Sequence, residues 1–137
     1  MHILKYPEIC YGPVPDGERA EKELADHPLL HTTKGAMDYL DLHLNRIADL
    51  VPKLMDKSWS FWSILQRAKA KKSFINTTLA LRIIAVWHQD NQELLAGMAD
   101  RVEEMYLADP QGVLARHYHY VAFMLRKIGK IDQGQDF

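Results

Sequence analysis

Histidines and carboxylates are the residues of this chain that could hold a metal ion or move a proton, and seven histidines among 137 residues is a high number. His27 and His31 are four positions apart, a spacing that on a helix presents two imidazoles to one metal ion. Pro28 lies between them and Thr32 offers a helix cap directly after them. This segment is therefore expected to connect two helices, and we predict no metal site in it.

The other histidines and acids match no catalytic pattern. His117 and His119 are two positions apart and diverge by roughly 200° around a helix, so they cannot serve one site. His117 is expected to be a hydrogen-bonded core or interface residue, and His119 to face solvent. A di-iron bundle requires Glu-x-x-His pairs, whereas Asp41 and His43 are separated by a single residue. We predict no catalytic residue, cofactor or metal, which disfavours an enzyme. A metal-dependent enzyme built from scattered histidines and carboxylates is the second alternative.

Recognition by contact is the other chemistry that the sequence suggests. Residues 57–72 contain five bases and no acid, and Trp59, Phe61 and Trp62 stand near the start of this stretch. Aromatic rings next to cations can stack on nucleotides or anchor a protein interface. Helical spacing favours a core position for Trp62 and for Trp59. Phe61 points away from that stripe and marks a binding surface if it is exposed.

Charge is distributed unevenly along the chain, although the formal net charge is only −1. Residues 111–130 contain four bases and no acid, while residues 89–109 carry six acids and one base. Two basic helices that share a face would attract phosphates or an acidic protein. The alternative is that basic and acidic helices neighbour and neutralise each other. The residues predicted to contact a partner are Trp59, Phe61, Arg67, Lys69, Lys71, Lys72, Arg116, His119, Arg126 and Lys127.

Helices must position these side chains, because apolar residues recur at three- and four-residue spacing in three stretches. The stripes are Met37, Leu40, Leu44, Ile47, Val51 and Leu54; Leu95, Met98, Val102 and Met105; and Leu114, Tyr118, Val121, Leu125 and Ile128. Such stripes are typical of helices packed against one another. The predicted fold class is all-α, a single-domain bundle of five to six helices. The bundle is expected over residues 16–130, with an extended arm over 1–15 and a flexible tail over 131–137.

Helix starts are predicted from side chains that can accept a hydrogen bond from the first turn. In chain order the predicted caps are Asp16, Thr32 or Thr33, Ser58, Ser73 or Asn76, Asp90 and Asp109. Pro52 lies within the second of these helices and is expected to kink or break it. The fourth helix is apolar on most sides and is therefore the candidate for the central one.

Composition sets the remaining expectations. Apolar residues make up 47% of the chain, which is ordinary for a globular protein. The single cysteine, Cys10, excludes an intrachain disulfide, and residues 1–15 lack the form of a secretory signal, so a cytoplasmic protein is expected. We predict a small non-enzymatic protein that binds another macromolecule, as an adaptor, inhibitor or regulatory subunit.

A protein partner is the expected one, and association with a membrane is not expected. The first alternative is a nucleic-acid-binding regulator that uses the basic helices at 57–72 and 111–130. Self-association through the first or the last apolar stripe is left open.

Overall fold

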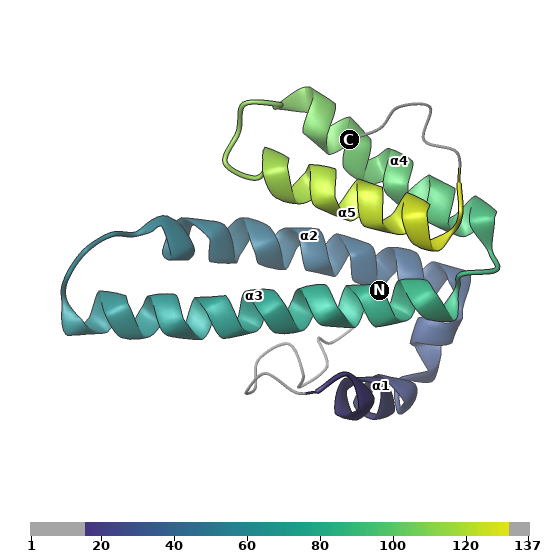
Figure 1. Ribbon diagram of the computed structural model, residues 1–137, viewed down its shortest axis with the longest axis horizontal. Coiled ribbons are helices and arrows are strands. Elements are labelled where there is room, and N and C mark those ends of the chain that lie inside the picture. Colours follow the sequence, from purple (N-terminus) through teal and green to yellow (C-terminus); the bar gives the residue numbers. More distant parts are fainter. Residues whose placement is uncertain (1–15, 132–137) are drawn as a thin grey trace. The chain divides into compact units, whose positions relative to one another are not determined.

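A computed structural model describes residues 16–131, and these residues form five α-helices, one 3-10 helix and no strand (Figure 1). The predicted all-α fold class is confirmed. The predicted arm over residues 1–15, and the predicted tail beyond residue 131, lie outside the described residues. In the described part of the chain, no helix combines the length and the apolar character needed to cross a membrane. The chain divides into two compact units, the first ending at Leu81 and the second beginning at Arg82.

The first unit begins with two capped helices, as the sequence predicts. In α1 (Gly17–Ala25) the Asp16 carboxylate accepts a hydrogen bond from the Arg19 N–H at 2.7 Å. The 3-10 helix η2 (Pro28–His31) follows, and α2 (Thr33–Met55) starts directly after Thr32. The Thr32 hydroxyl accepts from the backbone N–H three residues on, which satisfies one of the free donors of the first turn of α2.

Gly35 is required where η2 meets the start of α2. A Cβ atom at this position would lie 1.8 Å from the carbonyl oxygen of Leu29, a backbone atom that cannot move aside as a flexible side chain can. The Thr32 hydroxyl also donates to this carbonyl at 2.7 Å. The lack of a side chain at Gly35 therefore lets the 3-10 helix and the long helix approach each other closely.

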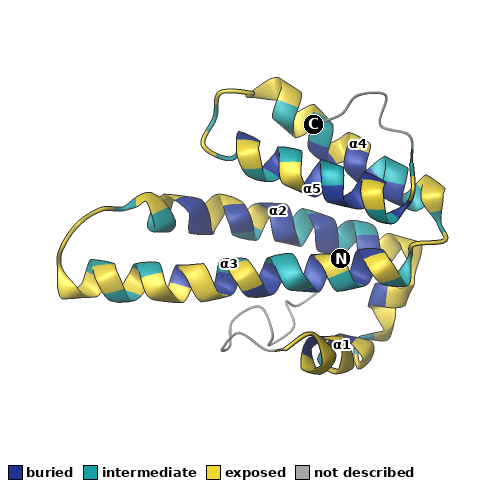
Figure 2. Ribbon diagram, in the orientation of Figure 1, coloured by how far each residue is buried: buried dark blue, intermediate teal, exposed yellow. Residues whose placement is uncertain are grey.

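The inner face of α2 is the predicted first stripe. Its members Leu40, Leu44, Ile47 and Val51 are buried, and Figure 2 shows buried positions recurring along α2. In the interior, Nδ1 of His43 lies 3.1 Å from the Thr77 hydroxyl, which fixes the register of α2 against the next long helix, α3 (Phe61–Trp87). His43 is thus a core residue that joins two helices.

The structure corrects three predictions about the long helices. The two helices predicted to start at Ser58 and at Ser73 or Asn76 are one continuous helix, α3. Ser73 and Asn76 are buried on its inner face, so they are interior polar residues instead of caps. Pro52 does not break α2, which continues to Met55. Only one backbone hydrogen bond is lost there, in the last turn of the helix, so α2 continues past the proline.

The apolar part of α3, the candidate for the central helix, is not buried on every side. Leu81 and Ile84 have no exposed surface, but Ile75 and Val86 are 40% and 41% exposed. One side of this helix therefore faces solvent along its apolar half.

The second unit contains the end of α3 and the pair α4 (Gln92–Ala108) and α5 (Ala115–Ile128). Asn91, and not the predicted Asp90, caps α4 by accepting from the Leu94 N–H at 3.1 Å. The last helix starts later than the predicted Asp109-Pro110. Asp109 instead ends α4, and turns follow in which its carbonyl accepts from the Gly112 N–H.

Apolar stripes and one polar bond hold α4 and α5 together. The second and third predicted stripes contribute buried residues, among them Leu95 and Met98 from α4 and Val121 and Leu125 from α5. The Gln92 amide donates to the carbonyl of Gly129 at 2.7 Å and so ties the start of α4 to the end of α5. Most members of these stripes are buried, as are most members of the α2 stripe, so they pack the helices within each unit. The predicted self-association stays a prediction.

Candidate functional site

Three aromatic side chains at the turn between α2 and α3 are almost fully exposed. Trp59 is 90% exposed, Phe61 72% and Trp62 75%. The Phe61 and Trp62 rings meet edge to face, with centroids 5.7 Å apart. We name these three residues the aromatic tip. The prediction that Trp62 and Trp59 lie in the core is wrong. Phe61 is exposed, which is the condition under which it was predicted to mark a binding surface.

Helix length explains why the aromatic tip is exposed. His43 of α2 lies opposite Thr77 of α3, and counting twelve residues along each helix from this pair places Met55 opposite Leu65. Met55 is the last residue of α2. The first turn of α3 therefore extends past the end of α2, so α2 offers Trp62 no partner to pack on (Figure 2).

Hydrogen bonds fix the turn that carries the aromatic tip. The Arg67 guanidinium donates to the backbone carbonyls of Asp56 and Ser58, the latter at 2.9 Å. The Asp56 carboxylate accepts from the Ser58 hydroxyl at 2.7 Å and from its N–H at 3.0 Å, and these bonds lower the pKa of Asp56. Arg67 was predicted to contact a partner, but its guanidinium instead holds the backbone of this turn.

The remaining cations at the start of α3 stay exposed. Lys69, Lys71 and Lys72 all face solvent, and within residues 16–131 none of them forms an ion pair. The whole of α3 contains no acid. Lys69 follows Trp62 by seven residues, and Lys72 follows Phe61 by eleven, so each lysine lies on the side of α3 that carries that ring. The start of α3 therefore carries a ring and a cation on each of these two sides, whereas Lys71, nine residues after Trp62, lies on the side of the helix opposite that ring.

The second basic stretch behaves differently, because acids of α4 pair with its most buried cation, Arg126. Arg126 is only 8% exposed and its guanidinium lies 3.1 Å from the Asp100 carboxylate and 2.7 Å from that of Glu103. The hydrogen bonds that Arg126 donates to the Glu103 carboxylate raise the pKa of Arg126. The Lys127 ammonium lies 5.6 Å from the centre of the Phe123 ring, a cation–π contact. In α5, then, the predicted internal neutralisation of basic by acidic helices holds for Arg126, whereas Arg116 and Lys127 form no ion pair within residues 16–131.

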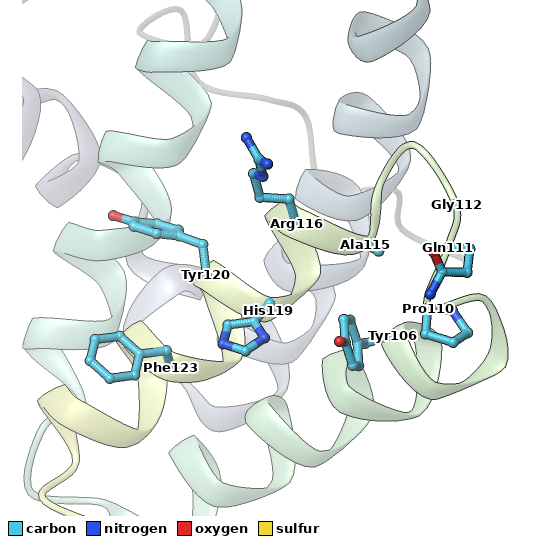
Figure 3. A pocket seen from close by; sticks show the side chains of 9 residues that line it. All are labelled: Tyr106, Pro110, Gln111, Gly112, Ala115, Arg116, His119, Tyr120 and Phe123. Atoms are coloured by element: carbon cyan, nitrogen blue, oxygen red, sulfur yellow. The ribbon is translucent and has the colours of Figure 1, made fainter. Parts of the chain in front are cut away.

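A hollow beside α4 and α5 brings together two other predicted contact residues, Arg116 and His119 (Figure 3). Its volume is about 660 Å³. We name it the α4–α5 hollow, and its lining is Tyr106, Pro110, Gln111, Gly112, Ala115, Arg116, His119, Tyr120 and Phe123. His119 is half-buried with its ring edge-on to Tyr106 at 5.6 Å, so the prediction that it faces solvent is wrong.

His117 lies next to this hollow but does not line it. Its ring stacks on Tyr120 with centroids 6.2 Å apart, and burial lowers its pKa from 6.5 to about 4. His117 is therefore neutral at pH 7. The separation of His117 from His119 agrees with their predicted divergence around the helix. Among residues 16–131, no three histidine, cysteine, aspartate or glutamate side chains gather closely enough to hold a metal ion.

Sequence reasoning missed the hollow as a site. Arg116, Tyr120 and Phe123 follow one another at four- and three-residue spacing, which puts them on one face of α5. That spacing was the available signal. The hollow also needs Tyr106 and the turn after α4, whose position depends on how the two helices pack.

The two basic stretches belong to different units of the chain, α3 starting in the first and α5 lying in the second. Arg67 and Arg126 are engaged internally, which leaves the aromatic tip, the three lysines of α3, and Arg116 as side chains available for contact. No protein-family model, curated protein or solved structure matches this chain.

Proposed function

We propose that this protein acts by binding a protein partner through the aromatic tip, as an adaptor, inhibitor or regulatory subunit. The observation that supports the proposal is the exposure of Trp59, Phe61 and Trp62, each above 70%. Single exposed apolar residues are common on protein surfaces, but three large rings within four positions form a patch. Tryptophan and other aromatic residues dominate the binding energy of protein interfaces when a partner covers them.

Charge defines the kind of partner. Lys69, Lys71 and Lys72 follow the aromatic tip along α3, the first and the last on the sides that carry Trp62 and Phe61, and α3 has no acid to neutralise them. A partner surface with an apolar centre and an acidic rim would cover the rings and pair with the lysines. The proposed partner is therefore an acidic protein surface. Binding to it should weaken as salt screens the lysines, whereas the contribution of the rings should persist.

A pair of matched variants tests the proposal. Trp59→Ser with Trp62→Ser removes two rings of the aromatic tip, and Leu107→Ser with Val113→Ser removes two apolar side chains that are 66% and 63% exposed in the second unit. Each variant and the wild type are used to capture proteins from the native host, and bound proteins are quantified by mass spectrometry. Thermal unfolding measured by circular dichroism checks the fold.

The proposal predicts that an acidic protein bound by the wild type and by the Leu107/Val113 variant is lost from the Trp59/Trp62 variant, with unfolding unchanged. The captured protein is then purified and its affinity measured against wild type and variant, where a loss of tenfold or more is expected. Equal binding by both variants would refute the role of the aromatic tip. Unfolding of the Trp59/Trp62 variant would reassign these rings to a structural role.

A nucleic-acid-binding regulator is a second candidate, supported by the aromatic rings next to the acid-free α3. Single strands bind to such surfaces by stacking and by contacts to phosphate. Fluorescence anisotropy with single-stranded DNA and RNA at 50 and 200 mM salt tests this candidate, since binding through several lysines should weaken steeply with salt. Absence of binding at low salt removes it.

A further inference from the structure

We propose that the α4–α5 hollow is a binding site for a small planar aromatic carboxylate. The proposal concerns residues of the second unit only, and it is independent of the aromatic tip. It depends on three properties of the hollow, namely its size, its rings and one unpaired cation.

The size and the rings suit a small aromatic molecule. A volume of about 660 Å³ falls within the range of small-molecule sites in proteins. Three aromatic side chains line it, Tyr106 from α4 and Tyr120 and Phe123 from α5. Tyr106 and His119 meet edge to face, and Figure 3 shows the two rings close together between the helices. A flat ligand ring can stack on or meet the edges of these groups.

Arg116 is the one lysine, arginine, aspartate or glutamate among the lining residues, and it favours an anionic ligand at its end of the hollow. It is exposed, and within residues 16–131 it forms no ion pair or hydrogen bond. The other cations of the same helix are engaged, Arg126 with two carboxylates and Lys127 with a ring. A guanidinium presents paired donors that match a carboxylate. One unpaired cation balances one negative charge, which favours a carboxylate over a phosphate dianion.

The polar side chains can orient such a ligand. Arg116 and Tyr120 are four residues apart, about one helical turn, and Figure 3 shows both side chains projecting from α5. The Tyr120 hydroxyl and the Gln111 amide are further hydrogen-bonding groups of the lining. A carboxylate held by Arg116 would place the attached ring against Tyr120 or Phe123, since all three side chains lie on one face of α5.

The test is titration of the ¹⁵N-labelled full chain with 2-naphthoate, followed by amide chemical shifts in NMR spectra. The neutral 2-naphthamide and adenosine 5′-monophosphate are titrated in parallel. The expected result is saturable shifts of the residues lining the hollow with 2-naphthoate, at least tenfold weaker binding of the amide, and weaker binding of the nucleotide. Equal binding of acid and amide, tighter binding of the nucleotide, or no shifts up to millimolar 2-naphthoate would overturn the proposal.

Two variants separate the role of Arg116 from a general effect of charge. Arg116→Gln replaces an exposed side chain and is expected to weaken 2-naphthoate binding about tenfold with an unchanged fold. Lys22→Gln removes one positive charge from α1 and is expected to leave the affinity unchanged. Equal affinity of wild type and Arg116→Gln, or equal losses in both variants, would contradict the assignment of Arg116 as the carboxylate ligand.

Discussion

The start of α3 and the helix α5 have similar compositions but use them differently. Both are basic and rich in aromatic residues. In α5 the cation Arg126 is buried against Asp100 and Glu103, and Tyr118 is buried with the apolar stripe. At the start of α3 the rings are exposed and Lys69, Lys71 and Lys72 have no ionic partner among the described residues.

The neighbouring helix accounts for this difference. Because α5 packs along α4, which supplies the acids, a buried arginine there is paired and its desolvation is compensated. The first turn of α3 extends beyond the end of α2. The aromatic side chains of this turn therefore have no residue of α2 to pack on. A basic, aromatic segment therefore becomes internal or external according to its neighbour, and its composition alone does not decide between the two outcomes.

Deleting a large side chain should distinguish the two segments most strongly. Leu125 of α5 has no exposed surface, so Leu125→Ala should lower the free energy of unfolding by about 2–5 kcal/mol. Trp62 of α3 is 75% exposed, and Trp62→Ala should change it by less than about 1 kcal/mol. Urea unfolding followed by circular dichroism measures both values. A loss at Trp62 as large as that at Leu125 would show that this ring is packed.

Acid should destabilise the protein through His117 of α5. Its pKa is 6.5 in the unfolded chain and about 4 in the folded protein, so between these values the unfolded state binds the proton. The stabilisation is fully present above pH 6.5 and is lost as the pH falls towards 4. The loss amounts to about 3 kcal/mol at most. Unfolding free energies at pH 7.5 and 4.5 should differ less for His117→Gln than for the wild type.

His88→Gln is the control for this pH dependence, because it removes a histidine of the same unit from the turn after α3 and leaves His117 in place. If His117→Gln loses stability towards pH 4.5 as steeply as the wild type does, the acid sensitivity comes from other groups.

Neutralising a cation should lower the free energy of unfolding by a smaller amount, and this amount should differ between α5 and the start of α3. Arg126→Gln removes two ion pairs and should cost about 1–2 kcal/mol, since the partner carboxylates are 69% and 41% exposed and keep much of their hydration. Lys71→Gln at the start of α3 should change the unfolding free energy by less than about 0.5 kcal/mol. Equal costs in chemical denaturation would mean that Lys71 has an ionic partner.

The smallest expected effect is a gain in stability instead of a loss. Lys71 stands four residues after Arg67, and like charges at this spacing destabilise a helix. Lys71→Glu replaces the repulsion by an attraction and should raise the free energy of unfolding by about 0.2–0.5 kcal/mol. Thermal unfolding at low salt is the sensitive measurement, and the gain should disappear in 1 M salt.

Local signals in the sequence predicted the fold class and the first helix starts. The side chains of Asp16 and Thr32 accept a hydrogen bond from the backbone N–H only three residues on. Their capping roles can therefore be recognised without knowledge of the packing. Ser73 and Asn76 carry the same side-chain chemistry but lie inside the first unit. Polar residues in a helix interior look like caps in a sequence, and only the packing distinguishes them.

The candidate sites were predictable only in part, for a related reason. Periodicity assigned Trp62 to a core stripe, because it gives the face of a helix but not the place where the neighbouring helix ends. Arg67 and Arg126 were predicted to contact a partner from their charge, yet their hydrogen-bond partners lie 9 to 26 residues away along the chain. The α4–α5 hollow likewise depends on two helices and the turn between them.

The bonds from Arg67 to the carbonyls of Asp56 and Ser58 have a consequence for binding. A loop that must become ordered on association loses conformational entropy, and this loss weakens affinity. The turn before α3 is already held in one shape before any encounter. For the proposed partner we therefore expect rigid docking with little rearrangement of the backbone, at a rate set largely by diffusion and by the attraction of the lysines.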